Sequence, residues 1–130
     1  MGAVTVTLDL DAAVGRWDPL RLDQIVTNLL SNADKYGAGQ PVTIRLRSDG
    51  GSVTLDVEDR GVGIDEVQRK RVFGRFERGL ASREGGFGLG LWITRQIVEA
   101  MHGTIAVSGE PGQGSVFSVM LPRDPAAVQP

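Results

Sequence analysis

The sequence contains no cysteine, which excludes disulfides, thiolate nucleophiles and cysteine metal ligands and fits a reducing compartment. It has no apolar run near the ~18 residues of a membrane-spanning helix and no signal-peptide pattern. Lysine and arginine form no stripe, and the net charge is −2, so a nucleic-acid or anionic-membrane surface is not expected. These absences predict a soluble cytoplasmic segment, whose parent protein could still carry a membrane anchor elsewhere.

The residues that are present describe one globular domain. A length of 130 residues, with 41% hydrophobic and 23% charged residues, suffices for a real core. Glycine is abundant, at 18 residues, but follows no fixed period. It therefore indicates turns and close backbone approaches rather than a fibrous repeat.

Two kinds of hydrophobic period alternate along the chain. Apolar and polar residues alternate in five stretches that predict strands, at about residues 4–10, 42–47, 53–58, 105–107 and 116–121. Helical periods predict three helices, at about residues 19–36, 65–72 and 89–102. Asp18 and Pro19 suit the start of the first helix, and Gly37 and Gly103 suit the ends of the two long ones.

The pattern also predicts how these elements pack. The outer face of the hairpin at residues 42–58 is too polar to be covered by helices. We therefore expect a two-layer α/β sandwich, with a mixed, mostly antiparallel sheet of five strands and three helices on one face. No linker interrupts residues 1–121, which form one domain, and the proline-rich stretch 122–130 is expected to be a frayed, disordered tail.

The first candidate site motif lies on the first long helix. Asn28, Asn32 and Lys35 share one arc of that helix, beside its apolar stripe. An amide oxygen can ligate Mg²⁺, and a lysine can neutralise phosphate. A solvated helix face is the alternative, but asparagine is a mediocre helix former, so two of them at i, i+4 need a reason.

The second motif follows the strand at residues 53–58. Asp59 is followed by Gly61, Gly63 and Ile64, and glycines here let a flat ring approach the backbone. A carboxylate can accept a hydrogen bond from the amine of adenine, which the carbonyl of guanine could not supply. An ordinary strand-to-loop turn is the alternative.

The third motif is a glycine-rich entry to the second long helix, at residues 85–90. Its Gly-x-Gly-x-Gly spacing, without a preceding strand, does not match a dinucleotide fingerprint, and the chain has no P-loop. Free N–H groups at a helix start favour phosphate. A flexible loop before a helix is the alternative.

Taken together and in this order, the motifs resemble the ATP-binding catalytic domain of sensor histidine kinases, in the superfamily of gyrase, Hsp90 and MutL (the Bergerat fold). The resemblance covers about residues 4–121. The stretches that carry it are similar to the N, G1, F, G2 and last glycine boxes of that family, at residues 28–36, 59–64, 73–76, 86–91 and 112–117 respectively.

The resemblance implies a role for each matching position. Asn32 would be the Mg²⁺ ligand, Asn28 and Lys35 would lie near the phosphates, and these three would carry catalysis. Asp59 would bind the adenine amine and Ser115 would lie near the adenine. Residues 74–88 would form a lid over ATP. The remaining nucleotide-contacting positions would be Tyr36, Gly61, Gly63, Ile64, Phe76, Gly86, Phe87, Gly88, Leu89 and Gly90.

One position separates kinases from hydrolases in this superfamily. The hydrolases carry a glutamate one turn before the metal-binding asparagine, as the base that activates water, and this chain has Asn28 there. An amide cannot take up a proton at neutral pH, so transfer to another acceptor is favoured over hydrolysis. The alternatives are a serine/threonine kinase of the anti-sigma-factor type and a nucleotide sensor without enzymatic activity.

The phosphate acceptor is missing from the sequence. His102, the single histidine, lies at the end of a helix, where a capping role is the ordinary interpretation. In the family the acceptor histidine lies in a separate dimerisation domain of the parent protein, which passes phosphate to a response regulator. We therefore expect a fragment that binds Mg·ATP as a monomer, belongs to a homodimeric parent and cannot autophosphorylate alone.

Overall fold

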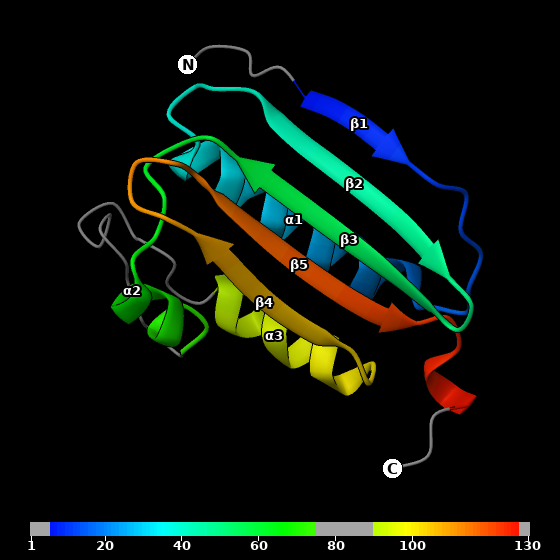
Figure 1. The fold of residues 1–130 in the computed structure, drawn as a ribbon. Coiled ribbons are helices and arrows are strands. Elements are labelled where there is room, and N and C mark those ends of the chain that lie inside the picture. Colours follow the sequence, from blue (N-terminus) through cyan, green and yellow to red (C-terminus); the bar gives the residue numbers. More distant parts are fainter. Residues whose placement is uncertain (1–5, 75–89, 128–130) are drawn as a thin grey trace.

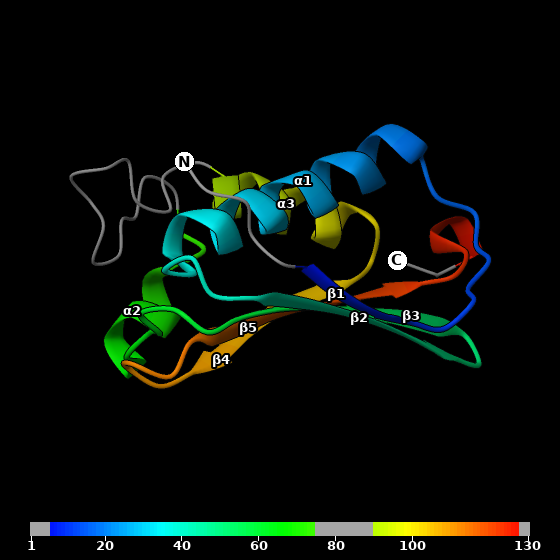
Figure 2. The same ribbon diagram turned by 90° about the horizontal axis from the view of Figure 1, so that it is seen from above.

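The computed structural model describes residues 6–74 and 90–127. The chain forms a five-stranded sheet with the long helices on one of its faces, while the short helix lies at one end of the sheet (Figures 1 and 2). In chain order the elements are β1 (Val6–Leu10), α1 (Pro19–Tyr36), β2 (Val42–Asp49), β3 (Ser52–Asp59), α2 (Glu66–Arg71), α3 (Gly90–Ala100), β4 (Thr104–Gly109), β5 (Ser115–Pro122) and the 3₁₀-helix η2 (Pro125–Ala127). This architecture confirms the predicted two-layer α/β fold.

The sheet is mixed, with strand order β1-β2-β3-β5-β4. β1 runs parallel to β2, because the chain crosses over the sheet through α1 between the two strands. The other pairs, β2–β3, β3–β5 and β4–β5, are antiparallel. β3 and β5 are therefore neighbouring interior strands, and the end of β3 lies beside the start of β5 at the same end of the sheet (Figure 1).

Local sequence fixes both ends of α1. The Asp18 side chain accepts a hydrogen bond from the Leu20 backbone N–H at 2.9 Å, and Pro19 occupies the first helical turn, where its missing N–H costs nothing. Gly37 ends the helix, as predicted. Its φ of −80° would suit any residue, but a Cβ there would lie 2.4 Å from the Ala33 carbonyl oxygen, so steric crowding explains the glycine.

The hydrophobic core lies between the sheet and the two long helices. α1 contributes one stripe of buried side chains, α3 contributes another, and the strands supply the floor. Its largest fully buried members are Ile25, Leu29, Val57, Val72, Leu91, Val98 and Val119. This core holds α1 and α3 side by side, with α1 against β3 and α3 against β4, which sets the frame for the candidate site.

β1 forms within the predicted stretch, but its apolar side is exposed. Val6, Leu8 and Leu10 are between 48% and 60% exposed. Their register opposite Val42, Ile44 and Leu46 puts them on the helix side of the sheet. The strand lies at the sheet edge beyond α1, so no helix covers it (Figures 1 and 2).

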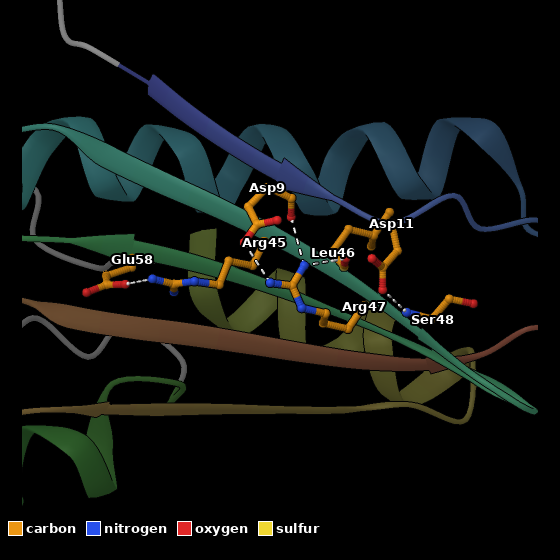
Figure 3. A network of polar contacts seen from close by, with 7 residues as sticks. All are labelled: Asp9, Asp11, Arg45, Leu46, Arg47, Ser48 and Glu58. Carbon is orange, nitrogen blue, oxygen red and sulfur yellow. Dashed lines mark hydrogen bonds and ion pairs between the residues drawn. The ribbon is translucent and has the colours of Figure 1, made fainter.

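The opposite face of the sheet carries ion pairs, as its polar pattern predicts. Arg45 pairs with Glu58 at 2.7 Å, and Arg47 pairs with Asp9 at 2.7 Å, so β2 is linked to the strands on both its sides (Figure 3). Arg47 also donates to the Asp9 carbonyl, and Asp11 accepts from the Ser48 backbone N–H (Figure 3). These contacts pair most of the charges on this face without a covering layer, although one buried oxygen of Asp56 has no hydrogen-bond partner.

The prediction of a frayed tail from residue 122 is wrong for residues 122–127. β5 continues through Pro122, whose carbonyl accepts a hydrogen bond from the Trp17 indole at 2.8 Å. The Arg123 N–H donates to the Gly51 carbonyl, and its own carbonyl accepts from the Arg16 N–H. These long-range bonds, which the local composition does not encode, order the segment up to η2.

Among the residues that the structure describes, no helix is both long and apolar enough to cross a membrane.

Candidate nucleotide-binding site

Asp59 ends β3 as a buried carboxylate held by two donors. It is 2% exposed. One carboxylate oxygen accepts from the Gly61 N–H at 2.9 Å, and the other accepts from the Ser115 hydroxyl at 2.8 Å. Each oxygen keeps a second lone-pair direction. The arrangement is a fixed acceptor at the end of the sheet, and it joins two predicted site residues that lie 56 positions apart.

The glycines after Asp59 are required by close packing on both sides. A Cβ on Gly61 would lie 1.7 Å from the Tyr36 carbonyl oxygen at the end of α1. Gly63 has a φ of 76°, and a Cβ there would lie 2.0 Å from the Glu110 carbonyl oxygen in the β4–β5 turn. The segment is thus wedged between α1 and that turn, and Ile64 follows it into the core at 2% exposure.

The β4–β5 turn locks this wall in place. The Gly112 N–H donates to the Val62 carbonyl at 2.7 Å, and the Gly114 N–H donates to the Gly61 carbonyl at 3.1 Å. Gly114 has a φ of 79°, and a Cβ there would lie 2.1 Å from the Asp59 carbonyl oxygen. This close approach brings Ser115 within reach of the Asp59 carboxylate.

The polar arc of α1 connects the two ends of the candidate site. Asn28 donates from its side-chain nitrogen to the Thr94 hydroxyl at 3.1 Å, and the same nitrogen lies 3.5 Å from the Gly90 carbonyl oxygen. Asn32 is buried and Lys35 is exposed. At the other end of the helix, Gly37 packs near Asp59. The arc therefore runs from the start of α3 toward the end of β3.

The structure brings most of the predicted residues to this region. α1 carries Asn28, Asn32, Lys35 and Tyr36, while Asp59, Gly61, Gly63, Ile64 and Ser115 gather at the ends of β3 and β5, and Gly90 opens α3 beside Asn28. The predicted nucleotide-contacting residues Phe76, Gly86, Phe87, Gly88 and Leu89, four of them in the predicted lid, lie outside the described residues. The individual roles of all these positions stay predictions.

Sequence reasoning missed Thr94. This side chain is completely buried in α3, donates from its hydroxyl to the Gly90 carbonyl at 2.7 Å and accepts from Asn28. The sequence signal was a threonine on the core-facing side of a helix whose other buried residues are apolar. A buried hydroxyl needs a hydrogen-bond partner.

A separate cavity lies under the first half of α1. It has a volume of about 230 Å³ and none of the predicted site residues lines it. Its lining is almost entirely apolar, made by Ala13, Trp17, Leu22, Ile25, Val26, Leu46, Val53, Leu55, Val119 and Leu121. A polar, charged nucleotide does not suit this lining. We therefore place the candidate site at the other half of α1.

Comparison with known protein families identifies the fold's relatives. Residues 17–125 match the family described as histidine kinase-, DNA gyrase B- and HSP90-like ATPases. The chain belongs to this family. The predicted resemblance is therefore confirmed, and membership of a family of ATPases supports ATP as the ligand.

Individual relatives point to the histidine kinase branch of the family. The chain is 38% identical to the circadian input-output histidine kinase CikA of Synechococcus elongatus, over 95% of the chain and 17% of that protein. The catalytic domain of the histidine kinase ThkA superposes with a TM-score of 0.81 at 26% identity, covering 95% of this chain and 81% of that one. Full-length ShkA, solved in complex with AMPPNP, superposes with a TM-score of 0.78 at 32% identity, over 92% of this chain and 25% of that one.

Proposed function

We propose that this chain is the Mg·ATP-binding catalytic domain of a two-component sensor histidine kinase. It donates the γ-phosphoryl group of ATP to a histidine on a separate dimerisation domain. The observation that carries the proposal is the buried Asp59 carboxylate, oriented by Gly61 and Ser115, in a chain whose relatives include sensor histidine kinases. The chain spans 17% of the length of CikA, so the phosphotransfer activity of a whole kinase is proposed for the protein to which this domain belongs.

Asp59 recognises the adenine. Its carboxylate needs a donor, and the exocyclic amine of adenine is one, whereas guanine presents a carbonyl oxygen at the same place. Burial strengthens the discrimination, because a carbonyl facing a water-excluded carboxylate would be left unpaired. The backbone wall of Gly61 and Gly63 lies beside this acceptor and suits a flat ring.

The residues that would hold the phosphates and Mg²⁺ lie on the polar arc of α1, which begins beside the start of α3. Amide oxygens are hard donors of the kind Mg²⁺ accepts, and Asn32 and Asn28 present two amides one turn apart on α1. Among the described residues, no cluster of three or more acidic, histidine or cysteine side chains could hold a metal alone. This fits a cation held jointly by one or two amides and by phosphate oxygens, with Asn32 as the protein ligand. Lys35 neutralises phosphate charge.

The chain transfers phosphate rather than releasing it to water. Asn28 occupies the position where a hydrolytic base would stand, and an amide does not accept the proton of an attacking water. In phosphoryl transfer the protein mainly positions the reactants and neutralises charge, so an incoming histidine needs alignment more than activation.

His102 is not the acceptor. It follows α3, whose 11 residues begin at Gly90. At 1.5 Å per residue the helix separates the two ends by about 16 Å, too far for direct transfer from phosphates at the start of α3. The acceptor is therefore supplied by the dimerisation domain of a homodimeric parent, which hands the phosphate to a response regulator. This fragment alone is a monomer that binds ATP without autophosphorylation.

A variant pair tests the nucleotide assignment. We expect Asp59→Asn to weaken ATP binding by about 1–3 kcal/mol, the scale of a buried hydrogen bond to a charged group, as measured by calorimetric titration. Asp56→Asn makes the same change on the uncovered side of β3 and should leave ATP affinity unchanged. Equal affinity for ATP in Asp59→Asn and the unaltered protein would rule out the assignment.

A mixed-domain assay tests the reaction. With the parent's dimerisation domain and Mg·ATP, the chain should place acid-labile phosphate on histidine. Acid-stable phosphate on a partner protein would instead indicate a serine/threonine kinase, and ATP binding without transfer to any acceptor would indicate a nucleotide sensor.

A further inference from the structure

We infer that Thr94 is a positioning residue that sets which end of the Asn28 amide faces the nucleotide. The inference rests on the proposed function for the location of the phosphates and cation. Thr94 is the fifth residue of α3, and its completely buried side chain contacts Asn28 of α1. It does not reach the nucleotide itself in this role but acts through Asn28.

The single proton of the Thr94 hydroxyl is already committed. The hydroxyl lies 2.7 Å from the Gly90 carbonyl oxygen, which can only accept, so the proton points there. The Asn28 amide lies 3.1 Å from the same hydroxyl oxygen. With its proton used, the hydroxyl oxygen offers only lone pairs to Asn28, and the group facing it must be a donor.

A second acceptor imposes the same orientation. The Gly90 carbonyl oxygen lies 3.5 Å from the Asn28 side-chain nitrogen. If the amide were turned over, its oxygen would face two acceptors with no proton between them. The hydrogen-bond network therefore distinguishes the two ends of the amide. The NH₂ group faces α3, and the carbonyl oxygen faces away from it.

This orientation decides what Asn28 can do. An amide oxygen accepts hydrogen bonds or ligates a cation, but it cannot donate to a phosphate oxygen. Asn28 therefore serves the cation or a water bound to it, together with Asn32 one turn along α1. Direct contact with phosphate oxygens falls to Lys35, the donor on the same arc.

Removing the hydroxyl of Thr94 tests this role. We expect Thr94→Val to reduce the gain in ATP affinity that Mg²⁺ provides by about three- to tenfold, because the freed amide can rotate. ATP affinity in EDTA should stay nearly constant. Calorimetric titration with ATP, in Mg²⁺ and in EDTA, gives the ratio of the two ATP affinities for each variant. Thr94→Ser keeps the hydroxyl and should restore the ratio.

A double-mutant cycle separates positioning from general damage. If Thr94 acts through Asn28, Thr94→Val should cause no further fall in the ratio once Asn28→Ala is present. Thr27→Val makes the same chemical change at an exposed position of α1 and should leave the ratio unchanged. Thr94→Ala, which also lacks the hydroxyl, replaces Thr94→Val if that variant does not fold.

Three results would overturn the inference. They are an unchanged Mg²⁺ ratio in Thr94→Val, an equal loss of affinity in Mg²⁺ and in EDTA, or a Thr94→Ser variant that behaves as Thr94→Val does. Failure of the proposed function has a different signature, since the unaltered protein would then bind no ATP, or bind it without any dependence on Mg²⁺.

Discussion

His102 adopts a backbone conformation that disfavours its side chain. Its φ is 62°, in the left-handed region, two residues after the end of α3 at Ala100. The helix closes there through a hydrogen bond from the Gly103 N–H to the Val98 carbonyl at 2.9 Å, so the turn is needed. Glycine is the residue that usually occupies such a position, because a Cβ costs about 1–2 kcal/mol in this region.

We expect His102→Gly to raise the free energy of unfolding by about 0.5–1 kcal/mol, because relief of the left-handed strain outweighs the added chain entropy. Urea denaturation followed by circular dichroism measures the change. His102→Ala removes the imidazole but keeps the Cβ, so it should give no gain. Equal gains in both variants would show that backbone strain is not the cause.

At the scale of single residues, sequence reasoning succeeds where a local pattern carries the information. Asp59, Gly61 and Gly63 are adjacent, so their role at a strand end could be predicted. The bonds of Asp59 to Ser115 and of Asn28 to Thr94 join residues 56 and 66 positions apart. No local period encodes such pairs, and Thr94 was missed for that reason.

Among the elements, β1 is held to its neighbour partly by charge. Its pairing with β2 is reinforced on the open face by the contact between Asp9 and Arg47. The hydrogen bond from Arg47 lowers the pKa of Asp9 below its ordinary value of 3.8, and the charge of Arg47 adds to the effect. The pair therefore stabilises the folded strand above pH 3.8, and this contribution is lost as pH falls through the lowered folded pKa.

Acidification should therefore loosen β1 before the centre of the sheet. We expect hydrogen-exchange protection of β1 amides, relative to β3 amides in the same sample, to fall as pH drops below 3.8. The effect is small because both side chains are exposed. In Asp9→Asn the relative protection of β1 should already be reduced at neutral pH. Asp23→Asn, on the exposed side of α1, should behave as the unaltered protein does.

The same strand shows where element-level prediction stops. Alternation of apolar and polar residues located β1, but the pattern assumed that its apolar side would be covered. Coverage depends on how far α1 extends across the sheet, which is a property of the assembled layers. The hairpin of β2 and β3 was predictable in both position and facing, because its polar side is uncovered and its apolar side meets α1.

At the scale of the whole molecule, an apolar pocket that is partly open to solvent remains beside the core. The cavity of about 230 Å³ lies between the first half of α1 and the sheet, within the apolar layer. Fold class, layer count and the positions of the two long helices followed from periodicity and from the polar hairpin face. The packing density of the core could not be predicted from these patterns, because it depends on how side chains from distant elements meet.

We expect Val119→Ile, which adds one methylene to a buried wall of the cavity, to raise the free energy of unfolding by about 0.5–1 kcal/mol. Val57→Ile adds the same group to a buried position that does not line the cavity, and should lower it by about 1–3 kcal/mol. Urea denaturation midpoints measure both changes. A shift of the same sign in both variants would contradict this picture of the core.

The edge position of β1 has a mechanical consequence. Within the described part of the chain, the strand is joined to the rest of the sheet only through β2 and a few side-chain contacts, whereas Asp59 and Ser115 lie on the interior strands β3 and β5. Tension applied at the N-terminal side would load β1 first and peel it from β2. The candidate nucleotide site would survive that first rupture. A tether attached at the N-terminal side could therefore be pulled without releasing the nucleotide.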